Sequence, residues 1–134
     1  MEKTFDFLKN RVEYYFLATV DGDKPSCRPF GATIVFDGKI YMMSHAGKSV
    51  VNQLEVNNNA CIVAYDGDAW IRINCKMIDD SNNIEAKKAL INEFEWAEAA
   101  GYTLDAPDFK VYYLADVDST IYDEEGGVLE REQF

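Results

Sequence analysis

The sequence predicts a mainly β protein with few helices, whose antiparallel strands form a closed or nearly closed barrel. Three Asp-Gly steps, at 21–22, 37–38 and 66–67, separate runs of β-favouring apolar residues, a pattern typical of tight hairpin turns. About six such runs accompany three helical segments, and closure of the sheet would leave no exposed edge. No repeat or linker interrupts the chain, so we expect residues 1–134 to form one domain.

The first third of the chain predicts one helix and two strands. Apolar residues at helical spacing predict a short helix over 4–12, and β-favouring residues predict a strand over Tyr14–Val20. A second strand is expected over Pro25–Phe36, although Pro29 and Gly31 interrupt it. Because proline lacks an N–H and glycine weakens a strand, this strand should lie at an edge, carry a bulge or pass close to a ligand.

The central stretch, Gly38–Val56, predicts a strand, a short polar loop and then a helix. The strand covers Lys39–Met43, the loop covers Ser44–Gly47, and Lys48 stands where the helix begins. Free backbone N–H groups, the positive end of the helix dipole and a lysine meet at this point, and together they favour phosphate binding. The alternative is an ordinary strand–helix connection with a solvated lysine.

The second half of the chain completes the barrel. Two strands, a helix and a last long strand are expected in that order, over 60–65, 69–78, 84–100 and 110–117. Strict alternation in the second of these strands places Trp70 and Arg72 away from its apolar face. Asn82 can cap the helix, 119–122 continue the last strand after a kink, and the acidic tail over 123–134 should be partly mobile.

Composition excludes several classes of function. The net charge is −11, so clustered cations for nucleic acid are not expected. No segment approaches the ~20 apolar residues of a membrane helix, and the charged N-terminus lacks the apolar core of a signal peptide, which predicts a cytoplasmic protein. Cys27, Cys61 and Cys75 form no CxxC motif, so we expect buried free thiols and no metal site.

No set of catalytic side chains stands out. The chain has one histidine, His45, and neither a GxSxG nor an HExxH motif. We expect His45 to be an ordinary loop residue, and we assign no catalytic residue. An enzyme with this sequence should therefore leave the difficult chemical step to a cofactor.

Three segments together resemble one known family. They are FLATVDGDKPSCRPF, DGKIYMMSHAGKSVVNQL and DAWIRINCKM, which cover roughly Tyr15 to Asp80. In their order and spacing they resemble the FMN-binding split-barrel family, the pyridoxamine 5′-phosphate oxidase-like proteins, and within it the small general-stress and nitroimidazole-resistance-like branch. The resemblance implies a six-stranded antiparallel split β-barrel, bound FMN and a homodimer with flavin at the subunit interface.

The resemblance also implies roles for individual residues. Arg28 would bind the flavin phosphate or ring, and Pro29 and Phe30 would shape the wall beside the ring. Ser44 and Lys48 would bind the phosphate. For Arg28 the structural alternative is a surface salt bridge.

Three more residues complete the implied site. The amide of Gln53 would reach the edge of the ring, and Trp70 and Arg72 would face the site from the other subunit. The structural alternatives are an exposed helical glutamine for Gln53 and a core or dimer contact for Trp70.

Three hypotheses for function follow. The first is an FMN-dependent oxidoreductase that passes electrons from a reduced nicotinamide donor to a small acceptor. The second is a non-catalytic sensor or carrier that binds FMN or another phosphorylated ligand. The third is a barrel that holds haem or a deazaflavin, with His45 as an axial haem ligand. An absorbance scan of the purified protein distinguishes flavin, haem and empty protein.

Overall fold

The computed structural model describes residues 1–134 and contains one antiparallel sheet of eight strands with three α-helices. In chain order the elements are α1 (Glu2–Asp6), a π-helical segment (Phe7–Arg11), β1 (Tyr15–Asp21), β2 (Lys24–Phe30), β3 (Ile34–Phe36), β4 (Lys39–His45), α2 (Ser49–Val56), β5 (Asn59–Tyr65), β6 (Ala69–Asp79), α3 (Ile84–Glu93), β7 (Phe109–Asp123) and β8 (Val128–Gln133). The mainly β, antiparallel fold is confirmed, with eight strands where six were expected.

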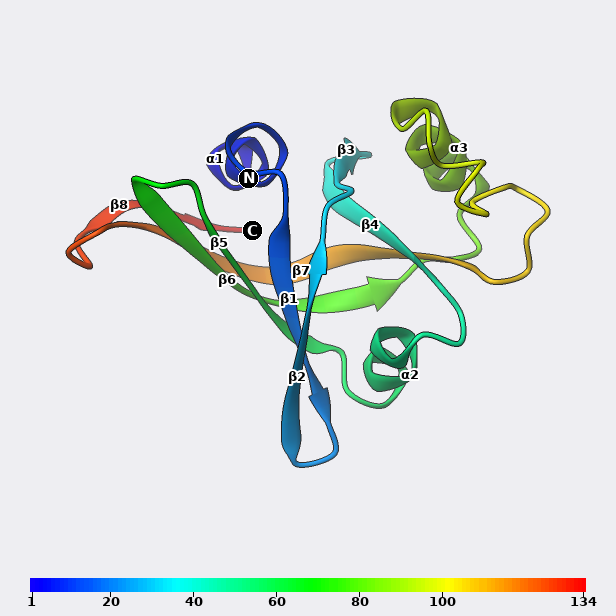
Figure 1. Cartoon of the computed structure of the whole chain (residues 1–134), viewed down its shortest axis with the longest axis horizontal. Coiled ribbons are helices and arrows are strands. Elements are labelled where there is room, and N and C mark those ends of the chain that lie inside the picture. The colour runs from blue at the N-terminus through cyan, green and yellow to red at the C-terminus, as the bar shows by residue number, and fades with distance from the viewer.

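The sheet is joined at its two ends by the chain and not by hydrogen bonds. Its strand order is β2-β1-β5-β6-β7-β4-β3, and β8 pairs with β7 beside this path. The end strands β2 and β3 follow each other in sequence and are separated only by residues 31–33. The curled sheet is therefore open in its hydrogen bonding, while the chain passes directly from one end to the other (Figure 1).

The expected strand over Pro25–Phe36 is therefore two strands. β2 pairs with β1, whereas β3 pairs with β4 at the opposite end of the sheet. The interruption expected at Pro29 and Gly31 is a break, which comes after Phe30. One straight strand could not pair at both ends of the sheet, so the chain leaves the extended ladder at this point.

A buried tyrosine holds this break in place. Tyr15 is 1% exposed, and its hydroxyl donates a hydrogen bond to the carbonyl of Ala32 at 3.2 Å. The same hydroxyl accepts a hydrogen bond from Thr33 Oγ1 at 2.9 Å. Burial raises the pKa of Tyr15 above its ordinary value, while the bond from Thr33 lowers it by less. The connection between the sheet ends is thus fixed to the start of β1.

The C-terminal tail is ordered by pairing, where the sequence predicted a partly mobile segment. β8 pairs with β7, from Asp118 opposite Gln133 to Tyr122 opposite Val128. Glu132 accepts hydrogen bonds from the backbone N–H and the hydroxyl of Thr4, both at 2.7 Å. Burial raises the pKa of Glu132, but hydrogen bonds from Thr4 and the terminal amino group outweigh it and lower the pKa to about 2. β8 thereby fastens α1 to the sheet.

The helices are short, and none is long and apolar enough to cross a membrane. α3 ends at Glu93, although a helix over 84–100 was expected. Residues 94–101 form turns in which Phe94 and Trp96 pack on each other at 5.2 Å between ring centroids. The N-cap is Asn83, whose side chain accepts from Ala86 N at 3.0 Å, and not the expected Asn82.

The last long strand bends as the sequence predicted. β7 runs through both expected segments, and Asp116 has a positive φ of 49° within it. The pairing register between β6 and β7 shifts beside this residue. Residues 109–113 of β7 pair with β4, and residues 112–123 pair with β6 along the other edge, so one bent strand joins both halves of the sheet.

Buried side chains form two hydrophobic clusters. The larger one lies between the sheet and the helices α1 and α2, and it includes Leu17, Ile62 and Ile73. The smaller one lies under α3 and includes Tyr41 and Leu90. Such burial, at roughly 25 cal/mol per Å² of apolar surface, is the main source of stability.

The cysteines differ in exposure. All three are free, but only Cys75 is buried, whereas Cys61 is half-buried and Cys27 is exposed. Ala18 in β1 pairs with Cys27 on one side and with Cys61 on the other. Both thiols therefore lie on the side of the sheet that faces away from the larger cluster, which corrects the expectation of three buried thiols.

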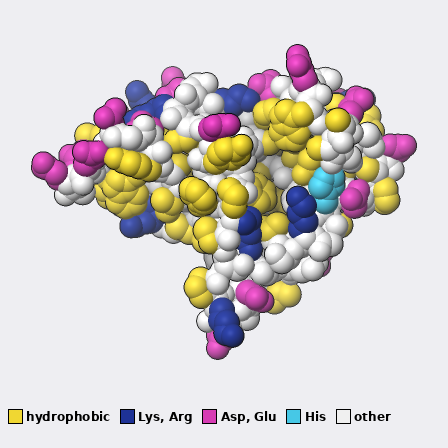
Figure 2. Space-filling model, viewed as in Figure 1, with side chains coloured by type: hydrophobic (Ala, Val, Ile, Leu, Met, Phe, Trp, Pro, Cys, Tyr) yellow, Lys and Arg dark blue, Asp and Glu magenta, His cyan; other side chains and the backbone are white.

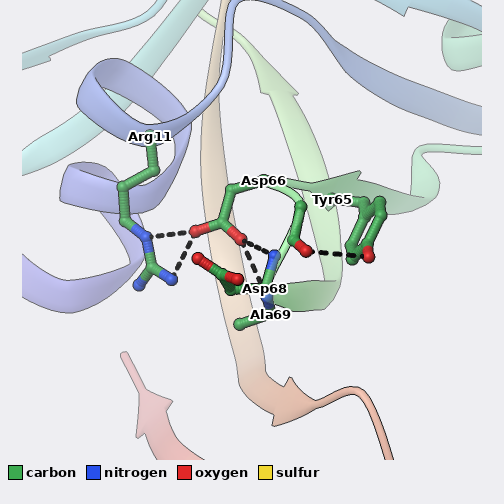
Figure 3. Close-up of polar contacts among 6 residues, drawn as sticks. Arg11, Tyr65, Asp66, Asp68 and Ala69 are labelled. Carbon is green, nitrogen blue, oxygen red and sulfur yellow. Dashed lines mark hydrogen bonds and ion pairs between the residues drawn. The ribbon is translucent and has the colours of Figure 1, made fainter.

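The Asp-Gly steps do form hairpin turns. Only Asp37-Gly38 has positive φ at both residues, as a type I′ turn requires. At the β5–β6 hairpin the Asp66 carboxylate closes the turn instead, since it accepts from Asp68 N at 2.9 Å and Ala69 N at 2.8 Å (Figure 3). Arg11 Nε donates to its other oxygen at 2.8 Å. The hydrogen bond from Ala69 N–H is the largest influence that lowers the pKa of Asp66.

Replacement of Asp66 by alanine should destabilise the protein by about 1–3 kcal/mol, because two backbone donors and Arg11 lose their acceptor. The pKa of Asp66 is lowered in the folded state, so its contribution exists above the ordinary carboxyl pKa and is lost as pH falls. Urea unfolding at neutral and acidic pH measures both effects. Asp68→Ala, at the exposed neighbouring carboxylate, is the control and should change little.

Replacement of Tyr15 by phenylalanine should cost about 1–2 kcal/mol, because the link between the sheet ends loses its hydroxyl partner. Tyr14→Phe is the matched control, since Tyr14 is 58% exposed. Equal midpoints of urea unfolding for the two variants would contradict a structural role for the Tyr15 hydroxyl.

Candidate functional site

A pocket of about 440 Å³ opens between the end of β2 and the start of α2. It lies where the two hydrophobic clusters meet, because Phe30 packs on the larger one while Met43 and Tyr102 belong to the smaller one. Its size falls within the range of small-molecule and cofactor sites.

Four of the eight predicted site residues line this pocket. They are Pro29 and Phe30 at the end of β2, Ser44 in β4 and Lys48 before α2. The loop turns sharply at Gly47, whose φ is +94°, and Lys48 N–H donates to the carbonyl of His45 at 3.3 Å. This local turn brings residues from two distant strands to one cavity.

Lys48 is the main cation of the predicted phosphate-binding site. Its backbone is extended, and Lys48 is the N-cap of α2, with no side-chain cap. The first N–H groups of any α-helix lack partners inside the helix, and the helix dipole favours an anion there. Lys48 is exposed and takes part in none of the nine ion pairs of the structure. Its charge is therefore available to a ligand.

Arg28 and Gln53 are bonded to each other beside the pocket. Arg28 Nη2 donates to Gln53 Oε1 at 2.9 Å and to Ser26 Oγ at 2.8 Å. Arg28 Nη1 donates to Thr19 Oγ1 at 2.7 Å and to the Leu17 carbonyl at 3.2 Å. Burial lowers the pKa of Arg28 from its ordinary value.

These contacts test the structural alternatives for both residues. Arg28 forms no ion pair with a carboxylate, so the surface salt bridge is wrong. Its partners are neutral acceptors, which leave its charge uncompensated. Gln53 is half-buried rather than exposed, and it also lines a shallower hollow beside α2. Arg28 and Phe30 are two residues apart on β2 and thus share one side of the strand.

Trp70 and Arg72 lie away from the pocket, on the outer face of β6. Trp70 stacks on Tyr122 with ring centroids 4.3 Å apart, and the Arg72 guanidinium lies 5.0 Å from the Trp70 ring. Arg72 pairs with Val63, which pairs with Phe16, which pairs with Pro29. Three strand spacings, about 14 Å, therefore separate Arg72 from Pro29 along the sheet.

The outer face of the sheet between these residues is apolar. Phe16 is 51% exposed, Val63 37% and Tyr65 58%. Figure 2 shows one face of the molecule, where hydrophobic side chains cover much of the surface and a few lysine and arginine side chains lie beside them. Exposed apolar patches of this kind mark interaction surfaces.

Sequence reasoning missed one wall of the pocket. Glu13 and Tyr14 directly precede β1, and Trp96 and Tyr102 come from the segment after α3. Trp96 and Tyr102 lie more than fifty residues from Ser44 and belong to no motif. The aromatic content of 94–102 is the one signal that could have indicated them.

His45 is not the plain loop residue that was expected. Its Nε2 lies 2.9 Å from the carbonyl oxygen of Ala100, and its ring stacks on Tyr102 with centroids 4.1 Å apart. Its Nδ1 is buried and lies 3.3 Å from Asp108 Oδ2. Nε2 faces the Ala100 carbonyl and Nδ1 is buried, so neither ring nitrogen is open to haem iron.

Solved structures share this architecture, although no protein-family model and no curated protein matches the chain. A NimC/NimA family protein from Clostridium acetobutylicum is 27% identical, with a TM-score of 0.91, over 100% of this chain and 93% of that chain. A protein related to general stress protein 26, of the pyridoxinephosphate oxidase family, from the same organism is 16% identical, with a TM-score of 0.69, over 100% and 96%.

A third structure is described as that of a ligand-binding protein. It is a pyridoxamine 5′-phosphate oxidase-related, FMN binding protein from Nostoc punctiforme PCC 73102, 14% identical, with a TM-score of 0.65, over 98% of this chain and 90% of that chain. At this identity the likeness concerns the fold. The resemblance inferred from sequence is thereby confirmed: the chain has the fold of the pyridoxamine 5′-phosphate oxidase-related FMN-binding proteins and of the NimC/NimA family.

Proposed function

We propose that this protein binds FMN and, as a homodimer, passes electrons from a reduced nicotinamide donor to a small acceptor. The observation that carries the proposal is the pocket at the start of α2, in a fold shared with FMN-binding proteins, lined by Pro29, Phe30, Ser44 and Lys48.

The residues present fit the phosphate of FMN. Lys48 offers an unpaired cation, and the first turn of α2 offers N–H groups and the positive end of its dipole. Ser44 adds a hydroxyl at the same pocket, although the residue is only 3% exposed. A dianion bound here would be held by charge-assisted hydrogen bonds, which are the stronger class.

The residues along β2 fit the flavin ring. Pro29 and Phe30 give the pocket an apolar wall, and Arg28 holds an uncompensated charge on the same side of the strand as Phe30. Bound FMN would supply the redox chemistry, because it can accept a hydride from a nicotinamide and return electrons to an acceptor. The chain's own part is to hold the phosphate, orient the ring and place positive charge beside it.

The homodimer is proposed from the outer face of the sheet. Phe16, Val63 and Tyr65 are exposed there, with Trp70 and Arg72 in the same region. A second copy covering this face would bury well over ~2,000 Å² in total, the range of obligate dimers. Trp70 and Arg72 would then approach the partner's pocket and not that of their own chain.

Two measurements test the proposed function in sequence. An absorbance scan of the purified protein, with and without added FMN, should show a flavin spectrum that stays with the protein on gel filtration. Steady-state oxidation of NADH or NADPH with added FMN then tests turnover. Tight FMN binding without turnover with any acceptor would leave the non-catalytic sensor or carrier in place of the oxidoreductase.

Replacement of Lys48 by alanine should weaken FMN binding roughly ten- to a hundredfold, because a charge-assisted contact to the phosphate is lost. Riboflavin, which lacks the phosphate, should lose far less. Flavin fluorescence titration measures both, and Lys24→Ala, at an exposed lysine that begins β2, is the matched control. Equal losses for FMN and riboflavin would place the phosphate elsewhere.

Replacement of Trp70 by alanine should act differently. We expect it to weaken FMN and riboflavin together, because the ring and not the phosphate would contact Trp70 across the dimer. An effect on FMN alone would contradict this placement.

Replacement of Phe16 by aspartate should convert the dimer to a monomer, because a charge would be buried in the apolar interface. Sedimentation velocity at micromolar concentration measures the change. Leu104→Asp, which adds the same charge at a side chain that is 43% exposed in the loop after α3, should leave the dimer intact. A wild-type monomer at this concentration would overturn the proposed assembly.

A further inference from the structure

The opening of the pocket is more aromatic and more exposed than its interior. Met43, Ser44 and Tyr102 line the pocket and are buried. Tyr14 and Trp96 line the same pocket, yet they are 58% and 49% exposed. A single exposed aromatic side chain is ordinary on a protein surface. Two of them at the opening of one pocket provide flat apolar surface that a ligand can cover.

Tyr14 lies against the short link between the two ends of the sheet. A Cβ added at Gly31 would lie 3.4 Å from Cδ1 and 3.7 Å from Cε1 of the Tyr14 ring. One edge of the ring therefore contacts the backbone of Gly31, which itself lines the pocket. The ring is thus held at the edge of the pocket, while more than half of its surface stays open to solvent.

Trp96 is held at the pocket by neighbouring rings. Its ring centroid lies 5.2 Å from that of Phe94 and 6.3 Å from that of Tyr102, with interplanar angles of 34° and 71°. Lys9 in turn contacts Phe94, because its ammonium lies 4.6 Å from the Phe94 ring centroid and 2.9 Å from Glu93 Oε1. The orientation of Trp96 is therefore set by packing, although half of its surface is exposed.

Glu13 and Lys48 are the two charged side chains that line the pocket. Neither takes part in an ion pair, with the other or with any other residue. Glu13 directly precedes Tyr14, whereas Lys48 stands before α2. If a ligand phosphate pairs with Lys48, Glu13 is the one charge of the lining that still has no partner.

An organic cation with a planar ring is the occupant that this opening fits. The faces of tryptophan and tyrosine rings attract cations, and the carboxylate of Glu13 adds a direct attraction between opposite charges. The net charge of −11 also raises the concentration of small cations near the protein. Pro29 and Phe30 add flat apolar walls, on which a planar ring buries more surface than a compact ammonium group.

We propose that Glu13, Tyr14 and Trp96 form a binding subsite for a planar aromatic cation at the opening of the pocket. The ring of the cation packs on the two aromatic side chains, and its positive charge lies beside the Glu13 carboxylate. The placement of this subsite beside a bound flavin rests on the proposed function, whereas the binding of the cation itself requires no flavin.

Isothermal titration calorimetry of the full chain without FMN tests the subsite. The probes are N-methylquinolinium, a planar cation, and quinoline, its analogue that is uncharged at neutral pH. We expect saturable binding of one N-methylquinolinium per chain, about tenfold tighter than the binding of quinoline. Equal affinities for the two compounds, or no saturable binding of the cation, would overturn the proposal.

Two variants separate the contribution of the charge from that of the ring. Glu13→Gln should abolish most of the preference for the cation and leave the affinity for quinoline unchanged, whereas Trp96→Leu should weaken both compounds. Glu98→Gln is the control, at an exposed glutamate of the segment after α3 that lines a different hollow. An equal loss of preference in Glu98→Gln would assign the effect to net charge and would overturn the role of Glu13.

Choline tests whether the ring of the cation must be planar. This compact cation should bind at least about tenfold more weakly than N-methylquinolinium, because it covers less of the flat walls. Equal affinities of the two cations would contradict a subsite for a planar ring.

A titration of N-methylquinolinium in the presence of FMN separates this inference from the proposed function. With FMN bound, the cation should still bind, because it occupies the opening and not the end of the pocket that holds Lys48. Mutual displacement of the cation and FMN would overturn the placement of the subsite beside the flavin. Binding of the cation by a protein that binds no FMN would support the subsite and overturn the proposed function.

Discussion

The arrangement of this molecule depends on the three residues, Gly31–Thr33, that join the two ends of the sheet. β2 and β3 lie at opposite ends of the strand order, yet they follow each other in the chain. A connection this short forces the sheet to curl until its ends meet, and the hydroxyl of Tyr15 secures it from within. Gly31 and Ala32 then form part of the pocket. The feature that makes the barrel incomplete in hydrogen bonding is the same one that brings β2 beside β4 and so creates the cavity.

Charge is unevenly compensated around this cavity. The chain has a net charge of −11, so most of its surface repels anions. Most lysines and arginines are paired with carboxylates, as Lys110 is with Asp79, but Arg28 and Lys48 are not. Arg28 is held by neutral oxygens along β1, β2 and α2, and Lys48 projects at a helix start. An otherwise acidic protein thus has two cations without a carboxylate partner in this region: Lys48 lines the pocket, and Arg28 directly precedes the lining residue Pro29.

The errors of sequence reasoning have a common physical origin. The β propensity of Pro25–Phe36 predicted one strand with an interruption. Its two halves pair with different strands, at opposite ends of the sheet. The acidic tail was expected to be partly mobile. Instead, it pairs with β7 as strand β8, and Glu132 accepts a hydrogen bond from the backbone N–H of Thr4 in α1. The helix over 84–100 ended at Glu93 because packing of Phe94 and Trp96 outweighed helix propensity. In each case a distant partner overrode a correct local preference.

Short-range patterns in the sequence predict most of the local elements and the loop with Ser44 and Lys48 before α2. Alternation in β6, the Asp-Gly turns and the apolar face of α2 are short-range patterns, and they identified the loop with Ser44 and Lys48. Which residues line a common cavity depends on tertiary packing. It set Trp96 and Tyr102 opposite that loop, bonded Arg28 to Gln53, and placed His45 between a carbonyl and a carboxylate. Such contacts join residues far apart in the chain, and the pairing of strands creates them, so no local pattern can contain them.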